Sequence, residues 1–182
     1  MNVLLHTCCA PCATHCILAL QEQGHAVTLF FSNANIAPTD EFHRRLEAVE
    51  HLATQLAVPL LVDPPDHTDW LKQVADGFEH EPEKGARCAR CFQYSLSRTL
   101  TTLRQQAFER FTSTLTVSPH KQSATLFEIG HALDKHLFLP IDFKKHNGFK
   151  KSLELSARFG LYRQTYCGCE FSRRQEPSPL ST

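Results

Sequence analysis

Short apolar segments alternate along this chain with longer segments whose apolar residues recur at helical spacing, and this alternation limits the folds open to it. Five apolar segments have the composition of buried strands, namely 3–6, 26–31, 59–62, 111–117 and 137–141. The segments between them are long enough for helices. Strands joined by helices form a mostly parallel sheet with helices on both faces. We therefore predict one α/β domain over residues 1–174, with a Rossmann-like sheet of about five strands.

Particular residues mark the expected helix ends. Asp40 is a candidate N-cap for the helix that follows the second strand. Further helices are expected over residues 70–78 and 149–159, and Gly160 would end the second of these. Beyond the predicted domain, the Pro- and Ser-rich residues 175–182 are expected to form a disordered tail.

The chain shows no sign of export or membrane insertion. Its first residues lack the basic region and long apolar run of a secretory signal, and no segment approaches the roughly 18 uninterrupted apolar residues of a membrane span. We expect a soluble cytoplasmic protein without membrane contacts. In that compartment cysteines are reduced, metal-bound or catalytic rather than paired in structural disulfides.

The eight cysteines gather into close groups. The groups are Cys8, Cys9 and Cys12, with Cys16 one helical turn later; Cys88 and Cys91; and Cys167 and Cys169. Thiols gathered in this way hold iron–sulfur clusters or zinc, or exchange between dithiol and disulfide. A buried small hydrophobe is a sufficient explanation for Cys16, but it does not account for the three groups.

The first two groups lie at the starts of predicted helices, where free amide groups and the helix dipole stabilise thiolates. Cys8, Cys9, Cys88 and Cys91 together can hold one cubane iron–sulfur cluster or one tetrahedral zinc ion. Adjacent cysteines are unusual in zinc sites, which favours the iron–sulfur cluster. Cys12 is then a spare thiol or the ligand of a second iron close to the cluster.

The third group has a different spacing. One glycine separates Cys167 from Cys169, which favours a strained and easily reduced disulfide. The alternative is that both residues are further metal ligands.

Reactive side chains are expected to meet at one edge of the sheet, because ligands of parallel α/β sheets bind beyond the carboxyl ends of the strands. The residues that follow the predicted strands there are Cys8, Cys9, Asn33, Asn35, His120 and Asp142.

The formal net charge is zero, but the charges are unevenly distributed. Residues 144–174 carry a net charge of +6, and the rest of the chain therefore carries −6. The basic residues are Lys144, Lys145, Lys150, Lys151, Arg158, Arg163, Arg173 and Arg174, against Glu154 and Glu170. A local patch of this kind is typical of contact with a nucleic-acid backbone, although a solvated helix face has the same composition.

Four segments together resemble one known family. They are LLHTCCAPC at 4–12, RCARCF at 87–92, TSTLTVSPHK at 112–121 and LYRQTYCGCEFS at 161–172. In this order and spacing they resemble the QueH-type epoxyqueuosine reductases, and the resemblance extends from residue 3 to residue 172. It implies reduction of the epoxide of epoxyqueuosine to an alkene at the wobble position of tRNA, the last step of queuosine synthesis. It further implies a [4Fe–4S] cluster on Cys8, Cys9, Cys88 and Cys91, and a redox-active pair at Cys167 and Cys169.

Such a reaction requires two electrons, two protons and a partner that supplies the electrons. The candidate proton donors are His6, His120, Asp142 and Tyr166. The basic residues from Lys144 to Arg163 would bind the anticodon arm, and Phe149, Tyr162 and Tyr166 are candidates for stacking on an unstacked base.

Two other classes of protein remain open on the residues alone. One is a zinc-stabilised RNA-binding module without catalysis. The other is a small-molecule thiol oxidoreductase or electron carrier.

Overall fold

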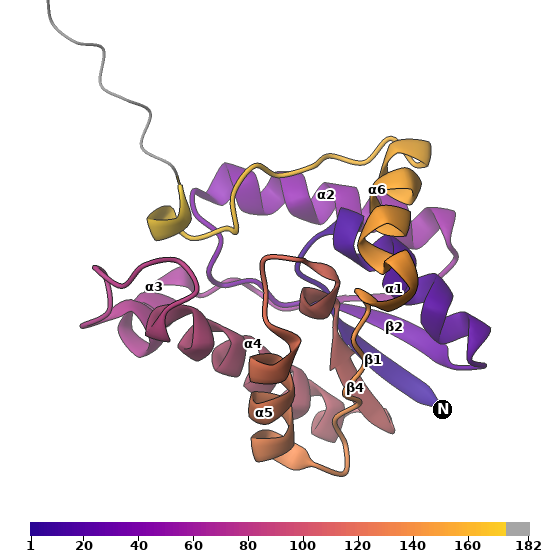
Figure 1. Ribbon diagram of the computed structural model, residues 1–182, viewed down its shortest axis with the longest axis horizontal. Helices are drawn as coiled ribbons and strands as arrows, with labels where there is room; N and C mark the ends of the chain where they lie inside the picture. The colour runs from indigo at the N-terminus through magenta and orange to yellow at the C-terminus, as the bar shows by residue number, and fades with distance from the viewer. Residues whose placement is uncertain (174–182) are drawn as a thin grey trace, which may run out of the picture.

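The computed structural model describes residues 1–173 (Figure 1). The strands are β1 (Asn2–His6), β2 (Ala26–Phe31), β3 (Leu60–Val62) and β4 (Arg110–Ser113). The longer helices are α1 (Ala10–Glu22), α2 (Thr39–Gln55), α4 (Ala86–Gln105), α5 (Ser123–Asp134) and α6 (Gly148–Arg158). A short helix, α3 (His67–Trp70), continues into a π-helical turn over Leu71–Ala75. The disordered tail predicted over 175–182 lies outside the described residues.

The four strands form one parallel sheet in the order β3-β2-β1-β4, which confirms the predicted α/β class (Figure 1). The fifth apolar segment, 137–141, adds a single bridge between Phe111 and Phe138 instead of a full strand. The segment bonds to β4 only through Phe111, whose amide donates to Leu137 O and whose carbonyl accepts from Leu139 N. The ladder does not continue, because the Leu139 carbonyl accepts from Thr112 Oγ1 at 2.8 Å and the Ile141 amide donates to that same carbonyl at 3.0 Å instead of to β4.

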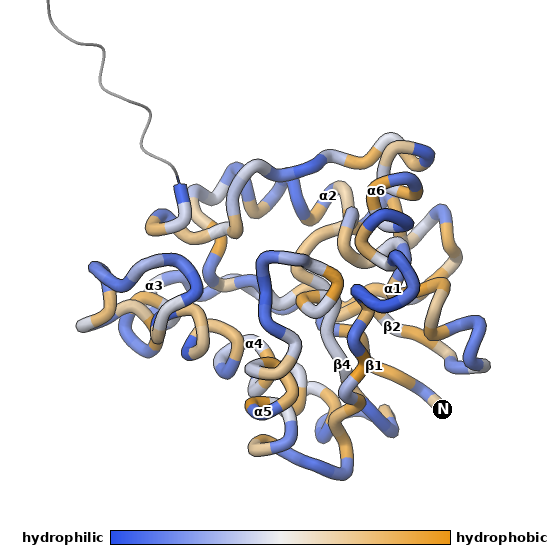
Figure 2. The backbone as a smooth tube through the Cα atoms, in the orientation of Figure 1, coloured by the Kyte–Doolittle hydropathy of each residue, from blue (hydrophilic) through white to orange (hydrophobic). Residues whose placement is uncertain are grey.

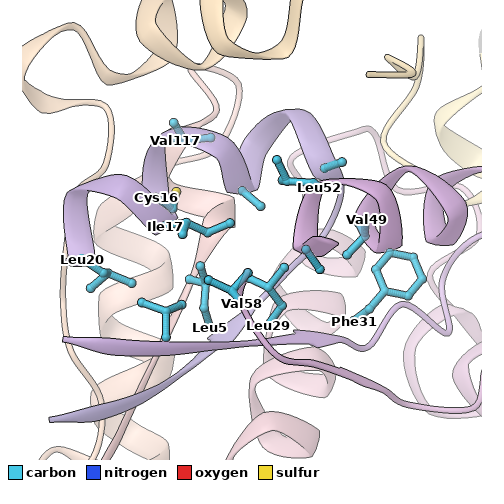
Figure 3. Packing of buried hydrophobic residues seen from close by; sticks show 14 of the residues in the cluster. Leu5, Cys16, Ile17, Leu20, Leu29, Phe31, Val49, Leu52, Val58 and Val117 are labelled. Atoms are coloured by element: carbon cyan, nitrogen blue, oxygen red, sulfur yellow. The ribbon is translucent and has the colours of Figure 1, made fainter. Parts of the chain in front are cut away.

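Helices cover both faces of the sheet, as predicted. On one face, α1 and α2 pack against Leu5, Leu29 and Phe31 (Figure 3). On the other face, α4 and α5 pack against Leu4 and Phe111. In Figure 2 the strands β1 and β2 are coloured as largely hydrophobic segments inside these layers. Each fully buried aliphatic or aromatic side chain stabilises the fold by about 1.5–3 kcal/mol.

Two further predicted local features differ in the structure. The strand expected over 111–117 ends at Ser113, whose hydroxyl accepts from the Leu115 amide and starts a 3₁₀ turn over Thr114–Val117. Asp40 is not an N-cap, because α2 begins after Pro38 and no side chain caps it. Asp40 instead lies in the first turn, where its charge favours the helix dipole.

Within residues 1–173, no helix combines the length and hydrophobicity needed to cross a lipid bilayer.

Candidate active site

The site lies at the carboxyl edge of the sheet, between β1 and β4. After β1 the chain adds β2 and β3 on one side of this strand, and it later adds β4 on the other side. The strand order therefore reverses between β1 and β4. Ligands of open α/β sheets bind at such a point. Cys8 follows β1, and Thr114 follows β4. The Cys8 amide donates to Thr114 Oγ1 at 3.1 Å, and that hydroxyl in turn lies 3.3 Å from Cys8 Sγ.

Three thiols form the first group of the site. The sulfurs of Cys8, Cys9 and Cys12 all lie within 4.8 Å of one another, and those of Cys8 and Cys9 are 3.8 Å apart. Cys9 is the N-cap residue of α1, where the positive end of the helix dipole favours an anion. Hydrogen bonds from the Cys12 and Cys8 sulfurs lower the pKa of Cys9. The three soft ligands are therefore arranged to hold a metal ion.

A second group of thiols lies on α4 and the C-terminal loop. Cys88 and Cys91 occupy the first turns of α4, as predicted, and line one pocket together with Cys167 and Cys169. Burial raises the pKa of Cys91 and of Cys88. These thiols are therefore protonated without a metal and would release protons when they bind one.

The two groups share one cleft of about 500 Å³. Cys8 and Cys12 line it from the β1 side, Cys91 from α4 and Cys167 from the C-terminal loop. The structure thus brings the predicted ligands and the predicted redox pair to one site. Among the described residues, however, the compact group of three thiols contains Cys12 and not Cys88 or Cys91. Cys16 is not among the residues that line this cleft, and it is fully buried in the core around Ile17 (Figure 3).

The loop that carries Cys167 and Cys169 lies beside α2 (Figure 1) and is hydrogen-bonded to it. Arg45 Nη1 donates to Cys167 O at 2.8 Å, and Arg45 Nη2 donates to Tyr166 O at 3.1 Å. Glu41 holds this guanidinium through an ion pair of 2.7 Å, and both side chains are buried. The position of the loop therefore depends on a charged pair in α2.

Gly168 allows the loop to approach the chain after β2. Its φ is +151°, and its carbonyl accepts from the Ala37 amide at 3.0 Å. A Cβ atom at this position would lie 2.7 Å from Asn35 Nδ2, so the Asn35 side chain would have to shift. The backbone conformation at this position favours the glycine between the two cysteines.

Lys121 is a residue of the site that the sequence patterns do not single out. Its ammonium lies 3.2 Å from Cys167 Sγ and faces the ring of Phe92. Burial acts to lower the pKa of Lys121, but the nearby sulfurs of Cys167 and Cys8 outweigh burial, and the pKa is raised. The signal in the sequence is its place at the end of the segment 112–121, one of the four that carry the family resemblance.

Comparisons with known proteins show the family of this chain. The family model of epoxyqueuosine reductase QueH matches residues 3–175. The chain belongs to this family. Several curated relatives carry the name epoxyqueuosine reductase QueH. The protein of Streptococcus pyogenes serotype M1 is 36% identical, and the match covers 96% of this chain and 71% of that protein. The protein of Thermotoga maritima is 31% identical, and the match covers 99% of this chain and 96% of that protein.

A solved structure shares the fold of this QueH-family chain. It is described as a predicted subunit of a tRNA methyltransferase from Methanocaldococcus jannaschii, and it has a TM-score of 0.57. The two proteins are 13% identical, and the match covers 83% of this chain and 73% of the other. At this level of identity the likeness shows a common fold and nothing about activity.

The four candidate proton donors of this QueH-family protein lie in different surroundings. His6 is fully buried between Ser113 Oγ at 2.9 Å and Ser32 O at 3.2 Å, and burial lowers its pKa. Tyr166 lines the cleft, but its hydroxyl donates to Ala37 O at 2.7 Å. His120 is exposed and lines the cleft beside Lys121.

Asp142, the fourth candidate, belongs to a hydrogen-bonded group outside the residues that line the cleft. Its carboxylate accepts from Ser123 Oγ at 3.0 Å and from the Lys144 amide at 3.2 Å. Burial acts to raise the pKa of Asp142, but these hydrogen bonds and the Lys144 charge hold the pKa below its usual value. Asp142 therefore carries a negative charge at neutral pH.

The predicted basic residues divide into two sets. Lys144 is part of the fold, because its ammonium donates to Thr116 O at 3.0 Å and to Lys121 O at 3.1 Å. Five others are exposed on or beside α6, namely Lys145, Lys150, Lys151, Arg158 and Arg163. Arg173 is also exposed, and Arg174 lies outside the described residues. Both Phe149 and Arg163 line the cleft, so the exposed set adjoins the thiols.

Replacing Arg45 with methionine is expected to lower the free energy of unfolding by about 3–5 kcal/mol, because the buried Glu41 carboxylate would be left without its partner. The matched control is Arg104→Met, which removes the ion pair with Asp134 from a side chain that is 59% exposed. That change should cost less than about 1 kcal/mol. Anaerobic urea unfolding measures both values. Equal losses would show that the Arg45 pair contributes no more than a surface ion pair.

Proposed function

We propose that this protein is an epoxyqueuosine reductase that acts on tRNA in the cytoplasm. The reaction removes the epoxide oxygen from the cyclopentane ring of epoxyqueuosine at the wobble position and leaves an alkene, which gives queuosine. The observation that carries the proposal is the convergence of all three cysteine groups on one cleft in a chain of the QueH family. It favours a reductase over a zinc-stabilised RNA-binding module or a small-molecule thiol oxidoreductase.

We propose Cys8, Cys9, Cys88 and Cys91 as the ligands of a [4Fe–4S] cluster, with Cys12 as a ligand of an adjacent iron. Thiolates are the protein ligands of such clusters, and the close sulfurs of the N-terminal group fit a metal centre. When bound, a cluster of this type transfers electrons one at a time.

Cys167 and Cys169 are proposed as the store of reducing equivalents. The epoxide loses its oxygen as water, which requires two electrons and two protons. Oxidation of a dithiol to a disulfide releases two electrons and two protons, so one pair supports one turnover. A second partner, an electron donor, must then reduce the disulfide. The position of Cys167 on the wall of the cleft supports this role.

The surroundings of the cleft suggest how the remaining proposed residues act. His120 is exposed at the cleft and is the proposed proton donor that is best placed to reach a bound nucleotide. Tyr166 and Phe149 present rings to the same cleft, where one of them can stack on an unstacked base. Tyr162 instead donates its hydroxyl to Glu41 at 2.9 Å, which supports a role in holding α2 and the loop together.

The activity itself is tested on tRNA. Anaerobically prepared protein with a chemical reductant should convert epoxyqueuosine in tRNA to queuosine, a loss of one oxygen atom. Mass spectrometry of the digested nucleosides follows both species. If iron-containing protein binds this tRNA and produces no queuosine, the proposed reaction is wrong.

The exposed basic residues of α6 are proposed to bind the tRNA backbone. Replacing Lys150 and Lys151 with glutamate should weaken binding about tenfold or more at moderate salt, because each neutralised phosphate releases a counterion. In a plot of log affinity against log salt concentration, the slope should become less steep by about 0.7–0.9 for each phosphate that the variant no longer neutralises. Iron content should not change.

A control with the same change in net charge separates α6 from a general charge effect. Lys72 and Lys135 lie on other elements, and their replacement with glutamate should affect binding much less. Unchanged affinity in the α6 variant, measured by anaerobic filter binding, would mean that the basic residues are only a solvated face.

A further inference from the structure

The two thiols of the proposed redox pair have different surroundings. Cys167 is partly exposed, lines the cleft, and has its sulfur 3.2 Å from the ammonium of Lys121. Cys169 is only 8% exposed and packs against Trp70 and Val74. An external reagent therefore reaches one sulfur of the pair more easily than the other.

Both partners in the pairing of Lys121 with Cys167 are held by separate parts of the fold. Arg45 on α2 bonds to the carbonyl of Cys167. Lys144 bonds to the carbonyl of Lys121, and the Lys121 ammonium lies over the ring of Phe92 on α4, at 5.9 Å from its centre. The cation is therefore positioned by the fold and does not depend on a flexible surface side chain.

Cys169 has the opposite environment. Its neighbours in the core are apolar, and burial raises its pKa. The nearby hydroxyl of Ser172 donates to the carbonyl of Cys169 at 2.8 Å. A thiol in this environment stays protonated, and although Cys169 lines the pocket beside Cys88 and Cys91, it is less accessible to reagents in solvent than Cys167.

We propose that an external thiol reductant opens the disulfide of the pair by attacking Cys167, and that Cys169 is the buried resolving thiol. Lys121 is the catalytic residue that makes Cys167 the reactive sulfur. This proposal rests on the proposed redox role of the pair. It assigns an order to two cysteines that the sequence does not distinguish.

The proposed step is balanced for a dithiol reductant. One reductant thiolate attacks Cys167 Sγ, the bond between Cys167 and Cys169 breaks, and Cys169 leaves as a thiolate that takes up one proton. The second reductant thiol then displaces Cys167, which is released as a thiolate beside the Lys121 ammonium. The reductant ends as a disulfide, and the pair has gained two electrons.

The test compares the two sulfurs directly on anaerobically prepared, iron-containing protein. The reduced protein is treated briefly with iodoacetamide, and fragmentation of the tryptic peptide 164–173 separates the two alkylation sites by mass spectrometry. Cys167 should be labelled about tenfold faster than Cys169. The oxidised protein is treated with a monothiol, mercaptoethanol, and quenched. The mixed disulfide should then be found on Cys167 and the free thiol at Cys169.

Variants test the role of the cation. Lys121→Met, which keeps the length of the side chain, should slow labelling of Cys167 about tenfold, because the charge-assisted hydrogen bond that stabilises the thiolate is removed. Lys121→Arg keeps the charge and should restore most of the rate. Lys135→Met removes a lysine elsewhere in the fold and should change nothing.

Three results would overturn the proposal. Equal labelling of Cys167 and Cys169 in the unaltered protein, or a mixed disulfide on Cys169, removes the assigned order whether or not the variants fold. Lys121→Met with an unchanged rate at Cys167 removes the role of the cation. None of these measurements uses tRNA, so they can fail while the protein still converts epoxyqueuosine. Failure of that conversion would instead count against the proposed function.

Discussion

Replacing either Cys167 or Cys169 with serine is expected to abolish conversion of epoxyqueuosine in tRNA while the iron content stays unchanged. A single thiol cannot form the intramolecular disulfide, and so it cannot release two electrons and two protons in one turnover. The two cysteines lie on a loop that is anchored to α2 through the Cys167 carbonyl and the Arg45 side chain. The substitutions therefore leave the backbone bonds of the loop in place. Nucleoside analysis and iron determination on the same samples give both values.

The matched control is a cysteine outside the cleft. Cys16 is fully buried in the core, and Cys16→Ala should retain both iron and turnover, with a modest loss of stability. If the Cys167 and Cys169 variants lose iron, these residues are metal ligands, and the electrons do not come from a thiol pair. If both variants keep normal multiple-turnover rates, the two residues have neither role.

The second large effect is expected at the proposed cluster ligands. Anaerobically prepared protein should be brown, absorb broadly in the visible range, and contain iron and inorganic sulfide. Replacing Cys9 or Cys91 with serine should remove the colour and most of the iron, because a hydroxyl is a poor ligand for such a cluster. These two positions are informative because Cys9 lies at the start of α1 and Cys91 on α4.

Further variants decide between two ligand sets. A cluster held by Cys8, Cys9, Cys88 and Cys91 predicts that Cys12→Ser keeps its sulfide and loses at most one iron. If Cys12→Ser loses all iron and Cys91→Ser loses none, the ligands are instead the three sulfurs that lie within 4.8 Å of one another. Full iron and colour in both the Cys9 and Cys91 variants would rule out the cluster assignment. Zinc without sulfide would indicate a structural metal site.

The sequence predicted the elements that depend on local pattern. The strand predicted over 26–31 is observed over the same residues, and Cys88 and Cys91 lie in the first turns of a helix. Apolar runs and helical spacing report which side chains of a segment are buried, and the period of the buried positions differs between strands and helices. The rule that ligands bind at the carboxyl edge of a parallel sheet then correctly located Cys8 and His120 near one cleft.

Strand ends were predicted less well, because they depend on single hydrogen bonds. The Ser113 hydroxyl turns the chain into a 3₁₀ helix where the apolar pattern continued. The apolar segment 137–141 is not a full fifth strand, because the Ile141 amide bonds to the Leu139 carbonyl of its own segment instead of to β4. Composition does not distinguish a serine that caps a turn from one that lies within a strand.

What the sequence by itself determined is the α/β class, the grouping of the thiols and the edge of the sheet at which they meet. Only the tertiary structure decided which side chains contact these thiols. Arg45 bonds to a carbonyl 122 residues away in the chain, and Lys121 reaches a sulfur 46 residues away. The structure also buried His6 completely and bonded the Lys144 ammonium to the carbonyls of Thr116 and Lys121. The sequence does not show whether a charged or polar residue binds a ligand, orients a loop or bonds to a buried carbonyl. Its role depends on its hydrogen-bond partners, and only packing brings those partners within hydrogen-bonding distance.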